Sequence, residues 1–288
     1  MRLIATADLH YDMADYRSKV RELADAMCRE QADVLAIAGD IFAGEIGYLV
    51  ECLHLFDGFQ GTKVLVAGNH DLWTYGGDSF RLYDETIPAA AAACGFHDLD
   101  KGPLVVGDVG LVGTVGWYDY SFRDESLGIP LRFYEHKAAP GYAQQAPDLA
   151  HLIDPDEALP PRALAARSFW NDGRMIHWDT DDRGFNQLTL ERLEAQCVAV
   201  EAEVRAIAAI THHIPFVEML RRRSDPSWGF GNAFMGSAGL GEVLQRHHEV
   251  SHVVFGHSHT REHRRVGHVE ATNVGCTYKM KRYDIIEV

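Results

Sequence analysis

Three short apolar segments alternate with two helical segments over the first seventy residues, and this alternation restricts the possible folds more than any other feature. The strand-like segments are residues 2–7, 33–40 and 63–68, and the helical segments are residues 16–31 and about 46–57. Continuous apolar runs of this length are typical of strands that are buried on both faces of a parallel sheet. The β-α-β-α-β order therefore predicts an α/β protein.

The rest of the chain continues this pattern but interrupts it twice. The further elements that we expect are a helix near 79–94, two short strands within 103–117, a helix at 188–208, a strand at 208–211, a helix near 239–247 and three or four strands up to the C-terminus. Residues 118–186 and 213–236 show no sustained period, and irregular stretches of this length are usually functional or mobile. We interpret residues 1–288 as one domain with an insertion at about 118–186 and a long loop at about 213–236.

The charge of the chain restricts its partners. Its 27 Lys and Arg residues against 42 Asp and Glu residues give a formal net charge of −15. Such a surface repels polyanions, and tight binding to long DNA or RNA depends on the neutralisation of phosphates. Long nucleic acid is therefore an unfavourable partner, whereas the oligomeric state is left open.

The cysteines and the apolar runs indicate the compartment. The five cysteines are odd in number, widely spaced and include no CxxC pair, which favours reduced thiols. The apolar run at the N-terminus is too short for a signal peptide, and no run reaches the roughly eighteen apolar residues of a membrane span. We therefore expect a cytoplasmic protein.

Polar side chains of a few kinds follow the predicted strands. These are Asp8, His10, Asp40, Asn69, His70, Asp71, His212, His257 and His259. Loops that leave the carboxyl ends of strands in an open α/β sheet converge at one edge. We therefore expect these side chains to form one site.

The chemistry of this set predicts bound metal. Carboxylate oxygens, imidazole nitrogens and one amide oxygen suit Mn, Fe, Zn, Co or Ni better than the all-oxygen cage that Ca prefers. A carboxylate that bridges two ions holds them roughly 3.5–4 Å apart. Asp40 is the natural bridge.

Five short motifs occur in an order that resembles a known family. They are "ADLH" at 7–10, "GD" at 39–40, "GNHD" at 68–71, "THH" at 211–213 and "GHSH" at 256–259. Together they resemble the pattern of the calcineurin-like metallophosphoesterases, D-x-H, G-D, G-N-H-[DE], H and G-H-x-H. The resemblance implies a four-layer α-β-β-α sandwich, with two mixed sheets flanked by helices, and two divalent metal ions.

The resemblance also implies a role for each motif residue. Asp8, His10, Asp40 and His259 would hold one metal, and Asp40, Asn69, His212 and His257 would hold the other. A metal-bridging hydroxide would attack phosphorus. His70 would stabilise charge or protonate the leaving group, and Asp71 would orient the His70 imidazole.

The implied activity is hydrolysis of phosphoester bonds. The family's protein Ser/Thr phosphatases carry an arginine in G-D-x-x-D-R-G, and "GDIFAGEIG" here has none. We expect a phosphodiesterase that acts on small nucleotide-like or other small phosphoesters. The alternatives are a phosphomonoesterase, then a nuclease, and in another class a non-catalytic protein that binds phosphate ligands on the same fold.

A competing metal motif lies close to the last block. His248, Glu249 and His252 match the His-Glu-x-x-His motif of zinc peptidases, which requires one helix through both histidines. The run from His252 reads instead as a buried strand, so we expect the helix to end near His248. A peptidase is therefore an unfavoured alternative.

Substrate contacts are the least determined part of the site. Arg221, Arg222 and Arg223 follow His212 in the long loop, where they could clamp a phosphate or lie at a solvated helix end. The aromatic residues of the insertion, including Trp170, could stack on a base or pack as a small core, and we favour the packing. We expect His213 to support a neighbouring ligand. The further histidines that we expect to be structural are His54, His97, His151 and His268.

Overall fold

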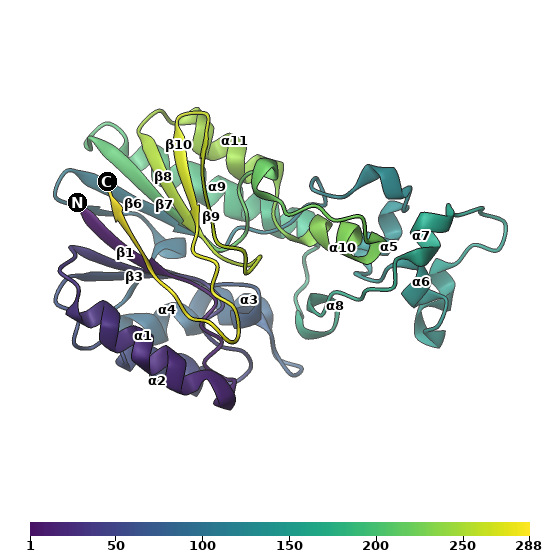
Figure 1. Ribbon diagram of the computed structural model, residues 1–288, viewed down its shortest axis with the longest axis horizontal. Coiled ribbons are helices and arrows are strands. Elements are labelled where there is room, and N and C mark those ends of the chain that lie inside the picture. Colours follow the sequence, from purple (N-terminus) through teal and green to yellow (C-terminus); the bar gives the residue numbers. More distant parts are fainter.

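The computed structural model describes all residues 1–288 and contains two mixed sheets packed face to face (Figure 1). The first sheet has the order β11-β1-β2-β3-β4, with bounds Asp284–Glu287, Arg2–Thr6, Val34–Ala38, Thr62–Val66 and His97–Asp98. The second has the order β5-β6-β7-β8-β10-β9, with bounds Leu104–Val106, Val109–Thr114, Ala206–Thr211, Val250–Phe255, Val269–Asn273 and Glu262–Val266. In each sheet the central strands run parallel. The edge strands β11, β5 and β9 run antiparallel to their neighbours, whereas the edge strand β4 runs parallel to β3.

Helices cover the outer face of each sheet. The helices on the first sheet are α1 (Arg17–Arg29), α2 (Ile46–His54), α3 (Ser79–Arg81) and α4 (Ile87–Ala93), and those on the second are α9 (Asp182–Val200) and α11 (Ala238–Arg246). Side chains alternate along each strand, so that Leu3 and Ala5 face the second sheet while Ile4 faces the helices. The expected four-layer α-β-β-α sandwich is confirmed.

The long helix starts and ends earlier than the predicted 188–208. Asp181 caps it by accepting a hydrogen bond from the Gly184 N–H, and α9 ends at Val200. Residues 206–211 form β7 in the middle of the second sheet, so their apolar run belongs to a buried strand rather than to the helix. The irregular segment therefore spans residues 118–181. The polar edge strand β9 was not assigned from the sequence.

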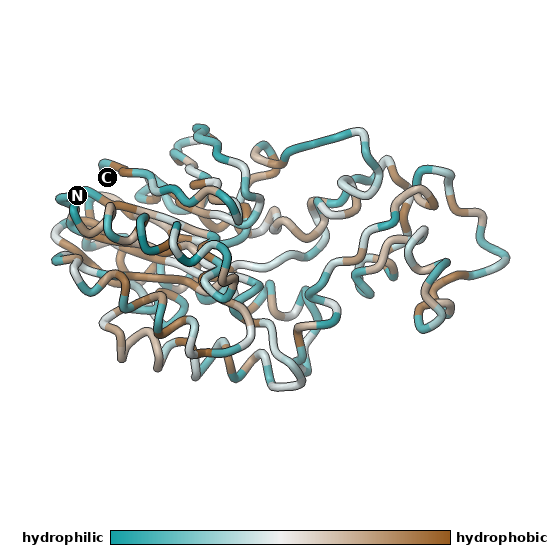
Figure 2. Tube along the Cα trace, turned by 60° about the horizontal axis from the view of Figure 1, so that its bottom comes forward, coloured by the Kyte–Doolittle hydropathy of each residue, from teal (hydrophilic) through white to brown (hydrophobic).

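The insertion and the long loop form a lobe at one end of the sandwich (Figure 1). Its helices are α5 (Leu131–Glu135), α6 (Pro140–Ala143), α7 (Pro161–Ala165), α8 (Asp172–Met175) and, from the loop, α10 (Pro226–Gly231). Figure 2 shows several chain segments that join the lobe to the sandwich. Tyr118, Tyr134 and Phe133 of the insertion are buried with Phe230 and Phe234 of the loop. The expected burial of these aromatic residues is confirmed, but they join the large cluster under the helices of the first sheet instead of forming a small core of their own, and Trp170 is only partly buried. None of the helices is both long and apolar enough to cross a membrane.

Candidate metal centre

The nine polar residues singled out in the sequence lie directly after strands of both sheets, at the end that carries the lobe. Asp8 and His10 follow β1, Asp40 follows β2, His212 follows β7, and His257 follows β8. Three groups of side chains place their ligand atoms within 4.8 Å of one another: Asp8, His10 and His259; His10, Asp40 and His70; and Asp40, His212 and His257. Both His10 and Asp40 belong to two groups, so the clusters form one continuous centre.

Asp40 lies between the two halves of this centre. Its Oδ2 is 3.7 Å from His10 Nε2, and its Oδ1 is 3.3 Å from His212 Nε2. On the outer sides, His259 Nε2 is 3.6 Å from Asp8 Oδ1, and Asn69 Oδ1 is 3.2 Å from His212 Nε2. The carboxylate is therefore in the position of a bridging ligand.

The backbone at five of these residues has a left-handed conformation. The positive φ angles are 53° at Asp8, 45° at His10, 53° at Asp40, 67° at His257 and 55° at His259. Only two other non-glycine residues of the chain, Tyr120 and Lys137, share this feature. Such conformations are unfavourable for residues other than glycine and concentrate at functional sites.

Glycines let the strand ends approach the candidate ligands. A Cβ at Gly68 would lie 2.2 Å from Asp40 Oδ1, and one at Gly256 would lie 2.6 Å from Asp8 Oδ2. Neither distance is sterically possible, so any larger residue at these positions displaces a candidate ligand.

Several buried polar atoms of the centre lack a protein partner, which fits bound cations. Asp8 Oδ2 and both ring nitrogens of His10 are buried without a hydrogen bond. His212 Nδ1 is 2.9 Å from the Ala38 carbonyl and His257 Nε2 is 3.1 Å from the Phe234 carbonyl, so both of these nitrogens act as donors. The inner nitrogens, His212 Nε2 and His257 Nδ1, lie 3.1 Å apart. Either a proton on His212 Nε2 or a cation held by both rings satisfies this contact.

Burial and charge act in opposite directions on these groups. Burial alone would lower the pKa of His212, but the Asp40 carboxylate raises it to about 9. Burial would raise the pKa of Asp40, yet His212 and His70 hold it well below its usual range. Burial lowers the pKa of His10 well below its usual range. Without a bound metal, Asp40 is therefore negatively charged, His10 is neutral and His212 carries a proton, which metal ligation at His212 releases.

One expected role is wrong. Asp71 does not orient the His70 ring, because its carboxylate accepts hydrogen bonds from the backbone N–H groups of Ile41, Phe42 and Gly68 at 2.7–2.8 Å. It ties the loop after β3 to the loop after β2 and thereby fixes Asp40. The His70 ring instead stacks on Trp73, with 3.7 Å between ring centroids.

The His-Glu-x-x-His motif does not form a metal site. Helix α11 ends at Arg246, Glu249 lies in a turn, and His252 lies in β8. The His252 Nδ1 contacts Ser251 Oγ at 2.9 Å, and neither histidine of the motif belongs to a metal-ligand group. The peptidase alternative is therefore wrong.

The side chains of Arg221, Arg222 and Arg223 lie in different environments. All three side chains are exposed, but Arg221 lines the cavity beside the centre, whereas Arg223 lies over the Trp228 ring at 3.8 Å. Nothing places Arg222 in the cavity. The histidines expected to be structural contact carboxylate or carbonyl oxygens, as do His54 with Asp57 and His97 with Gly102. His213 is buried behind the centre, with its Nδ1 on the Val115 carbonyl.

Other residues at the centre carried no signal in the sequence. Tyr278 lies with its ring centroid 4.8 Å from that of His10 and 5.0 Å from that of His259. Asp172 and Trp170 of the insertion lie next to Asn69 and His257. They belong to irregular segments, where no spacing or motif distinguishes one aromatic or acidic residue from another.

Comparison with known proteins agrees with this geometry. The sequence model of the calcineurin-like phosphoesterase family matches residues 1–261, so the chain belongs to that family. It is a metal-dependent phosphoester hydrolase, and the family uses a pair of divalent metal ions. No curated protein sequence matches the chain.

Solved structures show the same fold. The phosphopantetheinyl hydrolase of Mycobacterium tuberculosis is 16% identical with a TM-score of 0.69, over 96% of this chain and 89% of that chain. A dimetal phosphatase from Danio rerio is 15% identical with a TM-score of 0.54, over 95% and 86%. At these identities the likeness concerns the fold alone.

Proposed function

We propose that the protein is a phosphodiesterase for small nucleotide-like or other small phosphoesters. Asp8, His10, Asp40 and His259 hold one divalent ion in this proposal, and Asp40, Asn69, His212 and His257 hold the other. The bridging position of Asp40 and the unpartnered atoms of Asp8 and His10 support this ligand set.

The observation that carries the substrate class is a cavity of about 470 Å³ beside the centre. One side consists of candidate ligands and His70, and the other side comes from the insertion and the long loop. The lining residues of that other side include Phe169, Trp170, Leu220, Trp228, Met235 and Arg221. A cavity of this size and composition fits a phosphate that carries one compact organic group.

The chemistry divides between the ions and the side chains. Divalent ions held by these ligands would supply positive charge to the phosphoryl oxygens and would lower the pKa of a water molecule. His70 lines the cavity with its backbone N–H held by Asp40 Oδ1 at 2.9 Å, and it donates a proton to the leaving oxygen. Arg221 at the cavity wall neutralises charge on the substrate. Asp71 supports Asp40 from behind.

Two features argue against long nucleic acid as the substrate. The cavity is walled by the lobe, and the net charge of −15 opposes the approach of a polyanion. We also propose a cytoplasmic location, because all five cysteines are unpaired and four of them are buried.

The test is hydrolysis of bis-p-nitrophenyl phosphate beside p-nitrophenyl phosphate by Mn²⁺-loaded protein, with Asp40→Asn as the inactive control. A phosphopantetheinyl diester joins the panel because the similar Mycobacterium protein is named for hydrolysing that group. We expect the diesters to be preferred. A preference for the monoester establishes the phosphatase alternative, and two bound metals without turnover of any substrate establish the binding-protein alternative.

A further inference from the structure

The carboxylate of Asp172 connects the insertion to the metal centre. It lies at the start of α8, is 1% exposed, and accepts four hydrogen bonds from four side chains. Oδ1 accepts from Asn69 Nδ2 at 2.9 Å and from Trp73 Nε1 at 2.7 Å. Oδ2 accepts from Tyr118 OH at 2.9 Å and from Trp170 Nε1 at 2.7 Å. Since a carboxylate offers about four lone-pair positions, all are in use.

These contacts determine which way the Asn69 amide faces. An amide has one acceptor oxygen and one donor nitrogen, so fixing the nitrogen on Asp172 turns the oxygen to the opposite side. That oxygen lies 3.2 Å from His212 Nε2, within the second half of the centre. If the amide were reversed, its N–H group would face the metal position and could not be a ligand.

The same carboxylate holds two tryptophans beside the centre in place, of which Trp170 lines the cavity. Trp73, bound through its Nε1, stacks under the His70 ring with an interplanar angle of 25°. Trp170, bound through the other oxygen, lines the cavity and lies 5.9 Å from the His257 ring.

We propose that Asp172 is a positioning residue that sets the metal-facing orientation of Asn69 and, through Trp73, the ring of His70. This inference rests on the ligand set of the proposed function. It assigns to the insertion a part in metal binding in addition to its part in walling the cavity.

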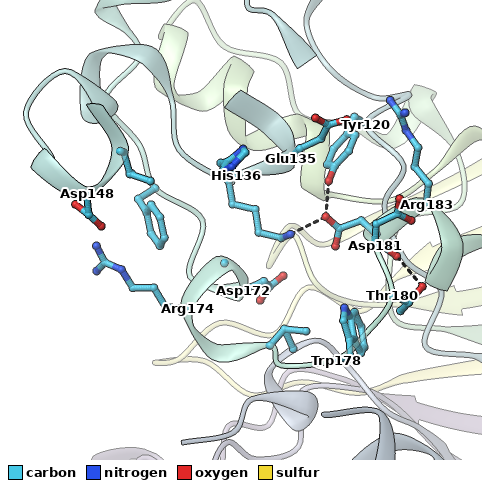
Figure 3. A pocket seen from close by; sticks show the side chains of 16 residues that line it. Tyr120, Glu135, His136, Asp148, Asp172, Arg174, Trp178, Thr180, Asp181 and Arg183 are labelled. Carbon is cyan, nitrogen blue, oxygen red and sulfur yellow. Dashed lines mark hydrogen bonds and ion pairs between the residues drawn. The ribbon is translucent and has the colours of Figure 1, made fainter. Parts of the chain in front are cut away.

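A second buried acid provides a matched control. Asp172 and Asp182 both line a neighbouring cavity of about 500 Å³, where Figure 3 shows Asp172 among Arg174, Trp178 and Asp181. Asp182 accepts hydrogen bonds from Trp117, Tyr120 and Lys137. Both of its oxygens are hydrogen-bonded, through three bonds against the four of Asp172, but none of its partners is a candidate metal ligand.

The experiment is calorimetric titration of Mn²⁺ into Asp172→Asn, Asp182→Asn and Asn69→Ala, with thermal melting as the check on folding. In Asp172→Asn, one side of the new amide is an NH2 group that cannot accept a hydrogen bond, so at least one of the four hydrogen bonds is lost and the Asn69 amide is no longer held in one orientation. We expect the second Mn²⁺ to bind at least tenfold more weakly while the first is retained. Asp182→Asn melts at a lower temperature but binds both ions as before. Equal Mn²⁺ binding in Asp172→Asn and the unmodified protein overturns the proposal.

Exchanging the two residues gives an independent test. Asn69→Asp combined with Asp172→Asn restores a donor and an acceptor facing each other, so we expect recovery of the second Mn²⁺. Asn69→Asp alone places two carboxyl groups against each other, and we expect weaker binding despite the extra charge. Tighter binding by that single variant overturns the proposal even where Asp172→Asn fails to fold.

If Asn69→Ala binds both ions normally, the ligand assignment is wrong. If Asn69→Ala alone loses the second ion, only the role of Asp172 is wrong.

Discussion

The metal centre and the base of the insertion both contain buried carboxylates, but the two regions differ in whether the buried polar atoms have hydrogen-bond partners. In the centre, Asp8 leaves one oxygen without a partner and His10 leaves both ring nitrogens without one. At the base of the insertion, Asp172 and Asp182 have every oxygen hydrogen-bonded to a Tyr, Trp, Asn or Lys side chain.

This difference distinguishes residues that can bind a ligand from residues that hold their neighbours in place. An unpartnered buried polar atom is unfavourable by about 1–3 kcal/mol, so a bound cation that supplies the missing interactions stabilises Asp8 and His10. A fully bonded buried carboxylate instead fixes its donors and has no capacity left for a ligand. Backbone strain points the same way, because five of the seven non-glycine residues with positive φ are candidate ligands.

The largest expected effect comes from changing Asp40, the candidate bridging ligand between the two ions. Asp40→Asn keeps an oxygen to accept the His70 N–H but removes the negative charge between the two ions. We expect activity to fall below detection and fewer than two metals per chain by elemental analysis. Asp182→Asn is the control with the same chemical change in the fully bonded region. Two full equivalents of metal in an active Asp40→Asn enzyme contradict the assignment.

The next effect distinguishes the two histidine motifs in residues 247–259. His257→Ala and His259→Ala each remove a nitrogen from a different half of the centre, so we expect weaker metal binding and loss of hydrolysis. Glu249→Gln and His252→Ala change residues outside every ligand group and should remain active. Metal content and diesterase turnover of the four variants decide this, and a folded but inactive Glu249→Gln would contradict it.

A smaller effect concerns His70, which lines the cavity. In the proposed function it donates a proton to the leaving oxygen and does not bind a metal. His70→Asn should keep both metals and lower kcat by roughly 10²–10⁴. Substrates with poor leaving groups should lose more than nitrophenyl esters. An equal loss for both kinds of ester would argue for a purely electrostatic role.

The sequence predicted the sandwich and the candidate ligands because both follow from short-range patterns. The apolar runs of β1, β2 and β3 and the helical spacing of Val20, Leu23, Ala24 and Met27 are local, and the burial of those four helix residues agrees with it. The ligand residues each follow such a run, so strand geometry brings them together.

The support of the site could not be predicted in the same way. Asp172 is 103 residues from Asn69, and no strand or helix pattern relates them. Asp71 lies next to His70 in the sequence, yet its carboxylate faces the backbone of Ile41 and Phe42. Proximity along the chain suggested a contact that the folded loops do not make.

Shortening residues 140–165 affects the wall of the cavity rather than the ligands. These residues do not line it, but the N–H groups of Ala139 and Gly141 bond to the carbonyls of Ser168 and Ala166, next to Phe169 and Trp170. We expect a change in KM or in diester selectivity of about tenfold or less, which corresponds to about 1.4 kcal/mol. Two bound metals should remain. A loss of metal with unchanged KM would place the segment's influence at the centre instead.

The smallest expected effect concerns Asp98, a buried carboxylate with no metal to bind and only one hydrogen bond, from the Asp100 N–H. Burial, and then the charge of Asp100, raises its pKa to about 8, against 3.8 in an exposed chain. Between about pH 4 and pH 8 the folded protein therefore holds a proton that the unfolded chain releases, so the free energy of unfolding falls as the pH rises.

Asp98→Asn keeps an oxygen for the Asp100 N–H and removes this dependence. The variant should match the unmodified protein near pH 4 and exceed its melting temperature near pH 8, by roughly 2–4 °C for each kcal/mol of stability that the unmodified protein loses over this range. Melting curves from pH 5 to pH 9 measure this, and parallel curves for the two proteins would show that Asp98 is ionised in the fold.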